Sequence, residues 1–355
     1  MNIDPAFWNG KKVFLTGHTG FKGTWLSLWL QSMGCEVTGY ALPPETEPNL
    51  FEMAHVADGM NSLIGDIREF EPLRDAMIAA QPDIVLHLAA QALVRPSYDH
   101  PLETYATNVM GTAHLLEAGR SVPSVRAVVI ITSDKCYENR EWERGYVETD
   151  AMGGHDPYSS SKGCSELVTS AYRNSFFSSD ESTCAIASGR AGNVIGGGDW
   201  ATDRIVPDTL MAFMRGEAAN IRNPNAVRPW QHVLEPLHGY LLLAERLHKD
   251  GRTFAEGWNF GPDDESSVPV GTMVQKMEAI WGSDVRSEIN VDPNAVHEAT
   301  LLRLDCSKAV ERLDWHPKLQ LDDTLKWTVE WYRQLHQEAD MRAFTLDQIK
   351  QYEVL

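Results

Sequence analysis

The chain has 355 residues, of which 43% are hydrophobic and 23% are charged, and its formal net charge is −19. This balance is typical of a globular protein with a large core, and it excludes a disordered or fibrous chain. The excess of acidic residues argues against nucleic acids and anionic membranes as partners. The length predicts two structural units or one large α/β domain.

Neither a membrane span nor a secretory signal is expected. No apolar run approaches the roughly 20 residues of a membrane helix, and no basic stretch followed by an apolar segment opens the chain. The five cysteines are scattered and odd in number. They predict reduced thiols in a cytoplasmic protein, without a disulfide framework or a metal site.

In the first half of the chain, short apolar runs alternate with helical patterns. Strands are predicted at 11–16, 36–40, 62–64, 84–88, 127–132 and 184–188, and helices at 24–33, 71–80, 104–120 and 159–175. This alternation predicts an α/β fold, with a doubly wound parallel sheet of the Rossmann type. We expect residues 1–190 to form the dinucleotide-binding domain.

The pattern changes after about residue 190, where Pro and Trp become frequent. Helices are predicted at 235–249, 272–281 and 321–337, and a strand at 257–260 is a candidate to rejoin the main sheet. We expect residues 191–355 to form mainly a smaller α/β substrate-binding domain. Four tryptophans at helical spacing are expected in the core or at a subunit interface, namely Trp25, Trp29, Trp327 and Trp331.

A glycine-rich turn lies between the first predicted strand and helix, with glycines at 17, 20 and 23. Gly17 allows a tight turn, Gly20 lets the backbone approach a pyrophosphate, and Gly23 permits close packing of helix on strand. The free N–H groups at the helix start favour phosphate. The same turn supplies further candidate cofactor contacts, namely His18, Phe21 and Lys22. The second strand is followed by no acidic residue that would distinguish NAD from NADP.

Two motifs carry candidate catalytic groups. Tyr158 and Lys162 are four residues apart in a predicted helix, so they share one helix face. The lysine ammonium, together with a positively charged cofactor, is expected to favour the phenolate of Tyr158 and make it a general base. The strand before this helix ends at Ser133, and Asp134 and Lys135 follow at the sheet edge where ligands bind.

The GxxGxxG spacing, Ser133 and the YxxxK motif together resemble the extended short-chain dehydrogenase/reductase superfamily. The resemblance implies NAD as cofactor and a catalytic set of Ser133, Tyr158 and Lys162. Tyr158 and Lys162 are also implied cofactor contacts. The remaining implied contacts are Asp66, Ile67, Ala89, Gln91 and Asn108. Taken alone, Asp66 is equally compatible with a helix cap.

The run Ser133-Asp134-Lys135-Cys136-Tyr137 resembles the CDP-glucose branch of the nucleotide-sugar 4,6-dehydratases. The other branches of that family typically have Thr-Asp-Glu where this chain has Ser133-Asp134-Lys135. The resemblance implies that Asp134 is the acid that protonates the C6 hydroxyl of the substrate sugar, so that it leaves as water. Lys135 stands where the others carry the base for the C5 proton. A lysine base must be neutral, so either the pKa of Lys135 is depressed or Asp134 or a water takes that proton.

The resemblance also implies contacts to a nucleotide-sugar substrate at Asn193, Arg204, Arg228, Trp230, His232 and Arg303. Arginine suits this role because its guanidinium fork matches phosphate oxygens. A homodimer or homotetramer is expected, with a role in supplying a deoxysugar for a cell-surface polysaccharide. The alternatives are a dTDP-glucose or GDP-mannose dehydratase, a 4-epimerase, a dehydrogenase that releases its reduced cofactor, and a dinucleotide-sensing protein without the chemistry.

Overall fold

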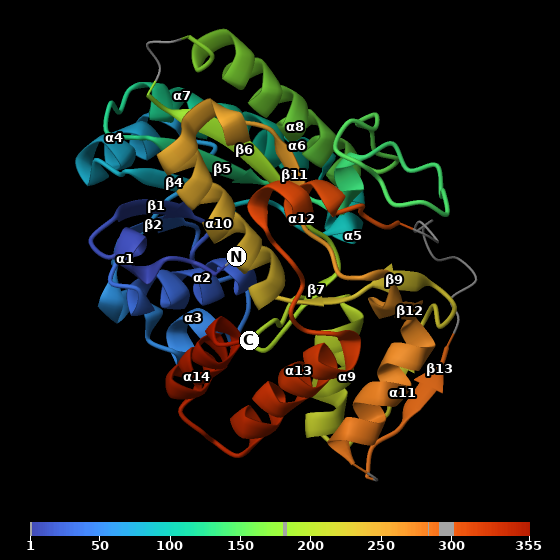
Figure 1. Cartoon of the computed structure of the whole chain (residues 1–355). Helices are drawn as coiled ribbons and strands as arrows, with labels where there is room; N and C mark the ends of the chain where they lie inside the picture. The colour runs from blue at the N-terminus through green and yellow to red at the C-terminus, as the bar shows by residue number, and fades with distance from the viewer. Residues whose placement is uncertain (1, 180–182, 283, 291–301) are drawn as a thin grey trace.

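The computed structural model describes residues 2–179, 183–282, 284–290 and 302–355, and its centre is a seven-stranded parallel sheet (Figure 1). The strand order is β11-β6-β5-β4-β1-β2-β3. The strands are β1 (Lys12–Thr16), β2 (Glu36–Ala41), β3 (Asn61–Ile64), β4 (Ile84–His87), β5 (Ala127–Ile131), β6 (Ala185–Arg190) and β11 (Gly257–Asn259). The predicted doubly wound sheet is confirmed, and the strand predicted at 257–260 does rejoin it.

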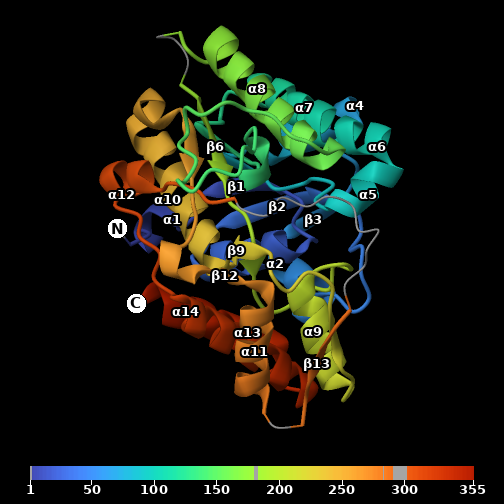
Figure 2. The same ribbon diagram turned by 90° about the vertical axis from the view of Figure 1, so that its right-hand side faces the viewer.

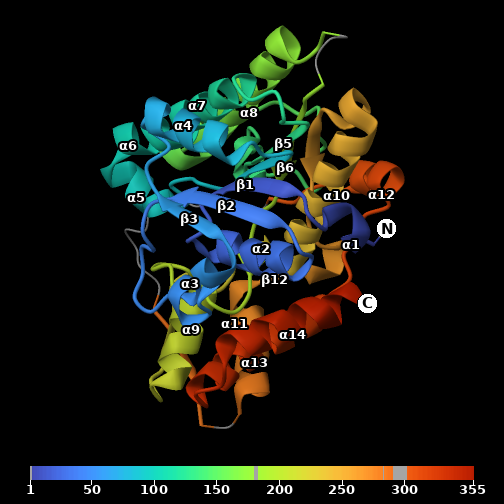
Figure 3. The same ribbon diagram turned by 90° about the vertical axis from the view of Figure 1, so that its left-hand side faces the viewer.

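Helices cover both faces of the sheet, as Figure 3 shows in side view. One face carries α4 (Phe70–Ala80), α7 (Gly111–Arg120) and α8 (Pro157–Phe176). The other carries α2 (Phe21–Ser32) and α10 (Leu234–Asp250), with α14 (Met341–Glu353) packed outside α2. All five residues of β5 are buried. A continuous apolar strand of this kind is expected where a parallel sheet is covered on both sides.

The long helix predicted at 104–120 is made of three joined segments. These are α6 (Pro101–Tyr105), a π-helical turn (Ala106–Met110) and α7. The carbonyl oxygen of Asn108 accepts hydrogen bonds from the hydroxyls of Thr112 and Ser165, both at 2.7 Å. These bonds tie the π turn to α8, and π turns of this kind are frequent at functional sites.

A smaller part lies below the sheet in Figure 2 and uses residues from the second half of the chain. Its helices are α9 (Ile205–Met214), α11 (Val270–Trp281) and α13 (Leu321–His336). Three two-stranded ladders accompany them, formed by β7 (Val194–Ile195) with β10 (Gln231–His232), β8 (Ala219–Ile221) with β13 (Ser287–Ile289), and β9 (Val227–Pro229) with β12 (Ser267–Pro269). Because β11 lies in the main sheet, α10 packs on it and α14 packs on α2, we propose a spatial division of the two units instead of a single boundary at residue 190.

The remaining elements are short and were not predicted. They are α1 (Pro5–Trp8), α3 (Leu50–Met53), α5 (Val94–Asp99), α12 (Ser307–Leu313) and the 3-10 turns Val56–Gly59, Asp134–Cys136, Gly251–Phe254 and Asp264–Ser266. None of the helices in the described ranges is both long and apolar enough to cross a membrane. Trp25, Trp29 and Trp331 are fully buried in the core, and Trp327 packs against it, in agreement with the prediction.

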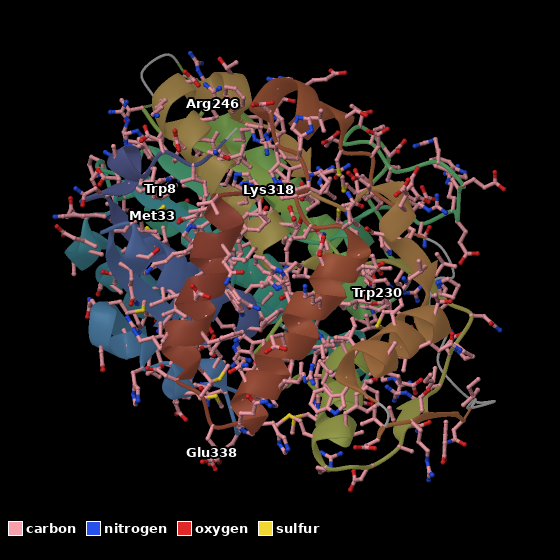
Figure 4. All side chains as sticks on the ribbon, turned by 60° about the horizontal axis from the view of Figure 1, so that its bottom comes forward. Trp8, Met33, Trp230, Arg246, Lys318 and Glu338 are labelled. Carbon is pink, nitrogen blue, oxygen red and sulfur yellow. The ribbon has the colours of Figure 1, made fainter. Side chains whose placement is uncertain are left out.

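The C-terminal helix is held by a buried carboxylate on α10. Glu235 is fully buried and accepts hydrogen bonds from the backbone N–H groups of Lys318 and Leu319, at 2.9 and 2.7 Å. Its other oxygen accepts a bond from the hydroxyl of Tyr352 at 2.8 Å. Lys318, labelled in Figure 4, reaches the carbonyl of Tyr352 at 3.2 Å. Burial raises the pKa of Glu235 to about 7 in spite of these bonds.

Glu235 is therefore expected to make stability depend on pH. Its folded pKa of about 7 lies above the ordinary value of 4.5, so its contribution to stability is full below pH 4.5 and is lost as pH rises through 7. Urea denaturation at pH 5 and pH 8 measures this effect. Glu235→Gln should lose less unfolding free energy over that interval than the parent protein does. Equal losses in both proteins would contradict the expectation.

Candidate active site

A cavity of about 1000 Å³ lies at the carboxyl ends of the central strands, between the sheet and the smaller part. Ligands bind at this edge in open α/β sheets. Most predicted site residues line it, namely Gly17, Gly20, Phe21, Lys22, Gly23, Asp66, Ile67, Ala89, Gln91, Ser133, Asp134, Lys135, Tyr158, Lys162, Asn193, Arg204, Arg228 and Trp230. The fold therefore brings together residues that are up to 213 positions apart, from Gly17 to Trp230 (230 − 17).

Glycine is present at the three loop positions for different structural reasons. Gly17 has a φ of +76°, and a Cβ there would stand 2.6 Å from the amide nitrogen of Ala89. A Cβ at Gly23 would overlap the carbonyl oxygen of Gly17. At Gly20 the nearest atom is that same oxygen, at 3.5 Å, so a side chain there has room in the protein. Gly17 and Gly23 are needed to form the turn, whereas Gly20 keeps space free at the cavity surface.

Alanine substitutions should separate these two roles. Gly17→Ala is expected to lower the thermal midpoint, because a left-handed backbone alone costs about 1–2 kcal/mol for a residue with a Cβ. Gly20→Ala is the matched control, and it should keep the thermal midpoint while weakening dinucleotide binding. Differential scanning fluorimetry with and without NAD measures both effects. A Gly17→Ala protein as stable as the parent would contradict this account of the turn.

Asp134 is buried and clamped at the end of β5. The hydroxyl of Ser133 donates to Asp134 Oδ1 at 2.9 Å, and the amide of Asn193 donates to Oδ2 at 3.3 Å. A Cβ at position 192 would overlap the carboxylate, so glycine at that position lets the two strand ends approach. Ser133 also shares a hydrogen bond with Tyr158 and accepts one from the backbone of Lys135 at 3.2 Å.

Burial shifts the pKa of both residues of the YxxxK motif. Burial raises the pKa of Tyr158 to about 12, although its hydrogen bond with Ser133 acts in the opposite direction. Burial and the nearby Lys22 ammonium lower the pKa of Lys162 to about 7, and its Nζ donates to the carbonyl of Ile131 at 3.3 Å. Burial therefore opposes the charged form of both groups, and the positive charge of a bound cofactor would act in the opposite direction on Tyr158.

Lys22 lies close to charged side chains of the candidate site. Burial and Arg204 lower its pKa to about 8, whereas Asp134 and Asp199 raise it. Trp25 ties α2 to the loop before Asp199, because its Nε1 donates to the carbonyl of Gly197 at 2.8 Å. Arg204 forms an ion pair with Asp199 at 3.0 Å. Lys22 is thus close to both the phosphate loop and the acid Asp134.

Two predicted cofactor contacts, Asn108 and Asp66, differ in where the structure places them. Asn108 lies behind the cavity wall, where it accepts from the backbone N–H of Gln91 and donates to the Gln91 carbonyl, both at 2.9 Å. It also donates to Ser161 at 2.8 Å, so it ties Gln91 to α8. Asp66 does line the cavity and pairs with Arg68. It does not cap α4, because Glu69 occupies the cap position.

Three predicted contacts lie elsewhere in the structure. His18 is fully buried, with Nε2 at 2.7 Å from the Ser62 hydroxyl. His232 is also fully buried, its ring lies edge-on to two tryptophan rings, and burial lowers its pKa to about 3. Arg303 pairs with Asp264 at 3.6 Å. None of the three is among the described residues that line the cavity, so we leave them out of the proposed site.

Sequence reasoning missed an ionic group that lines the cavity beside the substrate candidates. Asp203 binds Arg222 at 2.6 Å and Arg95 at 3.4 Å. Arg95 lies on α5, which follows β4 in the first half of the chain, whereas Asp203 and Arg222 belong to the second half. No local pattern links residues so far apart, and only the fold brings them together.

The comparisons with known proteins agree with this geometry. The family model described as GDP-mannose 4,6 dehydratase matches residues 14–328. A CDP-glucose 4,6-dehydratase of Salmonella typhimurium is 54% identical over 353 residues, which cover 99% of this chain and 98% of that protein. The chain belongs to the nucleotide-sugar 4,6-dehydratase family.

Solved structures of low sequence identity share the fold of this 4,6-dehydratase. A UDP-glucose 4-epimerase of Thermotoga maritima, solved with UDP-glucose, has a TM-score of 0.76 at 23% identity and covers 91% of this chain and 99% of its own. A dTDP-glucose 4,6-dehydratase of Bacillus anthracis in complex with NAD has a TM-score of 0.74 at 19% identity and covers 92% and 98%. In the described part of the dehydratase, no group of three or more His, Cys, Asp or Glu side chains is placed to hold a metal ion.

Proposed function

We propose that this dehydratase converts CDP-D-glucose to CDP-4-keto-6-deoxy-D-glucose and water. The observation that carries the proposal is Asp134-Lys135 placed beside Tyr158 in one cavity. Members of the family that act on other nucleotide sugars typically carry Asp-Glu at this position. The 54% identity to a CDP-glucose 4,6-dehydratase over almost the whole chain supports the same nucleotide.

The cavity residues fit NAD as the cofactor. Gly20 leaves open space in front of the first turn of α2, whose N–H groups suit a pyrophosphate. Ile67 and Ala89 line the cavity at the ends of β3 and β4, and Tyr158 and Lys162 line it at the start of α8. When bound, NAD supplies a hydride acceptor at C4 of the sugar and a hydride donor at C6.

The protein groups would divide the proton transfers among them. Tyr158, paired with Ser133, takes the proton of the C4 hydroxyl as C4 becomes a ketone. The ketone acidifies the C5 proton, which Lys135 removes and later returns to C5 when hydride is added at C6. Asp134 protonates the departing C6 oxygen, so that water leaves. Each proton transfer of this kind contributes about 10²–10⁴-fold to a rate.

The substrate would lie across the other half of the cavity. Arg204 and Arg228 line it and are proposed to pair with the diphosphate, because a guanidinium matches phosphate oxygens. Asn193, which already holds Asp134, is proposed to contact the same group. Trp230 lines the wall and would contact the nucleoside.

The cofactor balance tests the reaction class. The dehydratase should convert many equivalents of CDP-glucose for each NAD, with no net rise in absorbance at 340 nm when turnover ends. A dehydrogenase would instead produce one reduced cofactor per substrate. Stoichiometric NADH would therefore overturn the proposal.

A homodimer or homotetramer in the cytoplasm is proposed for the assembly. Large apolar side chains are exposed on packed neighbouring helices, namely Leu102 on α6, Met110 on the π turn and Leu167 on α8. Exposed apolar surface of this kind marks interaction sites. None of the five cysteines, all of which lie in the described part of the chain, forms a disulfide, and reduced thiols suit the cytoplasm.

A further inference from the structure

A buried ion pair lies directly behind the YxxxK motif. Glu166 is on α8, one turn after Lys162, and only 5% of its surface is exposed. One carboxylate oxygen accepts a hydrogen bond from Thr132 at 2.5 Å. The other accepts from Ser188 at 2.7 Å and pairs with Arg190 at 2.8 Å. Both oxygens thus have hydrogen-bond donors within the protein.

The partners of Glu166 lie beside the catalytic residues on three elements. Thr132 directly precedes Ser133 at the end of β5. Arg190 ends β6, three residues before Asn193, which holds Asp134. Glu166 itself shares α8 with Tyr158 and Lys162. The Glu166 carboxylate therefore holds three elements in place relative to one another. They are the end of β5, which leads to Asp134, the end of β6, which leads to Asn193, and α8, which carries Tyr158.

The network continues to the loop that follows Lys135. Arg190 donates a second bond, from Nη1 to the hydroxyl of Tyr137, at 2.7 Å. That hydroxyl donates to Asn259 on β11, also at 2.7 Å. Tyr137 lines the cavity two residues after Lys135. The same ion pair thereby holds the loop on which the proposed C5 base sits.

Glu166 also sets the charge around Lys162. Three other titratable groups face the Lys162 ammonium, namely Lys22 from α2, His87 from β4 and Cys136 after β5. Burial lowers the pKa of His87 to about 3 and raises that of Cys136 well above its ordinary value, so both are neutral near pH 7. Lys22 repels a proton on Lys162, whereas the Glu166 carboxylate attracts it.

Two arginines face Glu166 in turn, Arg190 from β6 and Arg173 from its own helix. Both favour the ionised carboxylate, and the pKa of Glu166 lies below its ordinary range as a result of Arg190 and the two hydroxyl donors, despite burial. Buried ion pairs are weak contributors to stability, because desolvation offsets most of the attraction. The place of this pair, behind the catalytic groups, therefore points to a role in the reaction.

We propose that Glu166 is a positioning residue for the oxidation at C4, which acts through Lys162 and Thr132 without touching substrate. The inference rests on the proposed function of Tyr158 and Lys162. It predicts that loss of the carboxylate makes Lys162 lose its proton at lower pH. Because the cationic form of Lys162 is needed, the alkaline limb of the activity profile should move to lower pH.

The test compares pH profiles of kcat and KM for CDP-glucose in Glu166→Gln, Glu166→Asp and the parent protein. In Glu166→Gln, kcat should fall on the order of tenfold more at pH 8 than at pH 6, as expected for a shift of one pKa unit, with KM changed little. Glu166→Asp keeps the charge, so its alkaline limb should stay near that of the parent. Glu235→Gln is the matched control, because Glu235 is also buried and accepts three hydrogen bonds but does not line the cavity.

A folded Glu166→Gln protein with the parent alkaline limb would overturn the inference, as would an equal displacement in Glu235→Gln. If the unpaired Arg190 prevents folding, the double variant Glu166→Gln/Arg190→Gln removes both charges and should show the same displacement. If the parent protein forms no product, the proposed function fails instead. In that case the pH dependence of NAD binding tests the inference. The pH at which NAD affinity falls should be lower in Glu166→Gln than in the parent protein.

Discussion

Tyr158→Phe is expected to lower kcat for CDP-glucose by about 10³-fold, within the range for loss of a general base. The Tyr158 side chain lines the cavity, and its hydroxyl is hydrogen-bonded to Ser133. This hydroxyl is the group proposed to take the proton of the C4 hydroxyl. Phenylalanine fills the same space, so the fold and the KM should change little. Steady-state kinetics and circular dichroism of the purified variant measure these quantities.

Tyr240→Phe provides the control for this substitution. Tyr240 is fully buried, and its hydroxyl has no hydrogen-bond partner among the described residues. It packs near Gly189 of β6 but does not line the cavity. Its loss should leave kcat within about threefold, since no proton transfer is assigned to it. A Tyr158→Phe protein as active as Tyr240→Phe would show that another group takes the C4 proton.

Asp134→Asn and Lys135→Met are expected to block dehydration at different steps, each by about 10²–10⁴-fold. Asparagine cannot protonate the C6 oxygen, but it leaves Lys135 free to remove the C5 proton. In D₂O, CDP-glucose recovered from Asp134→Asn should therefore carry deuterium at C5. Lys135→Met should form neither the product nor the deuterated substrate. Mass spectrometry and proton NMR of the recovered sugar nucleotide distinguish these outcomes.

The same experiment decides between the two candidate bases. Deuterium at C5 with Lys135→Met but not with Asp134→Asn would assign the base to Asp134. Exchange in both variants would point to a water molecule. Ser133 and Asn193 each donate to one oxygen of Asp134, so its carboxyl group is held in a fixed position at the end of β5.

The sheet was predictable because each central strand is a continuous apolar run bounded by turns. The helices with clear periodicity, such as 159–175, were found to within a few residues of α8. Short elements such as α5 and the two-residue strands β7 and β10 carry too few residues for a pattern. The π turn at Asn108 was also hidden, and the hydrogen bond that ties it to Ser165 comes from another helix.

The site was predictable wherever a motif lies at a strand end, as Gly17 and Asp134 do. Sequence reasoning failed where orientation decides the role. His232 lies close in sequence to Trp230, which lines the cavity, yet its ring packs between tryptophans away from it. The ion pair between Glu166 and Arg190 gave no signal, because the two residues are 24 positions apart and meet only in the folded core.

The central claim is the identity of the substrate, and one competition experiment tests it most directly. Purified protein with catalytic NAD is given CDP-D-glucose, dTDP-D-glucose and GDP-D-mannose together, and proton NMR follows all three sugar nucleotides over time. The account predicts that CDP-glucose alone disappears and that a new C6 methyl signal replaces it. Consumption of another sugar nucleotide in preference to CDP-glucose, or no methyl signal from any of them, would contradict it.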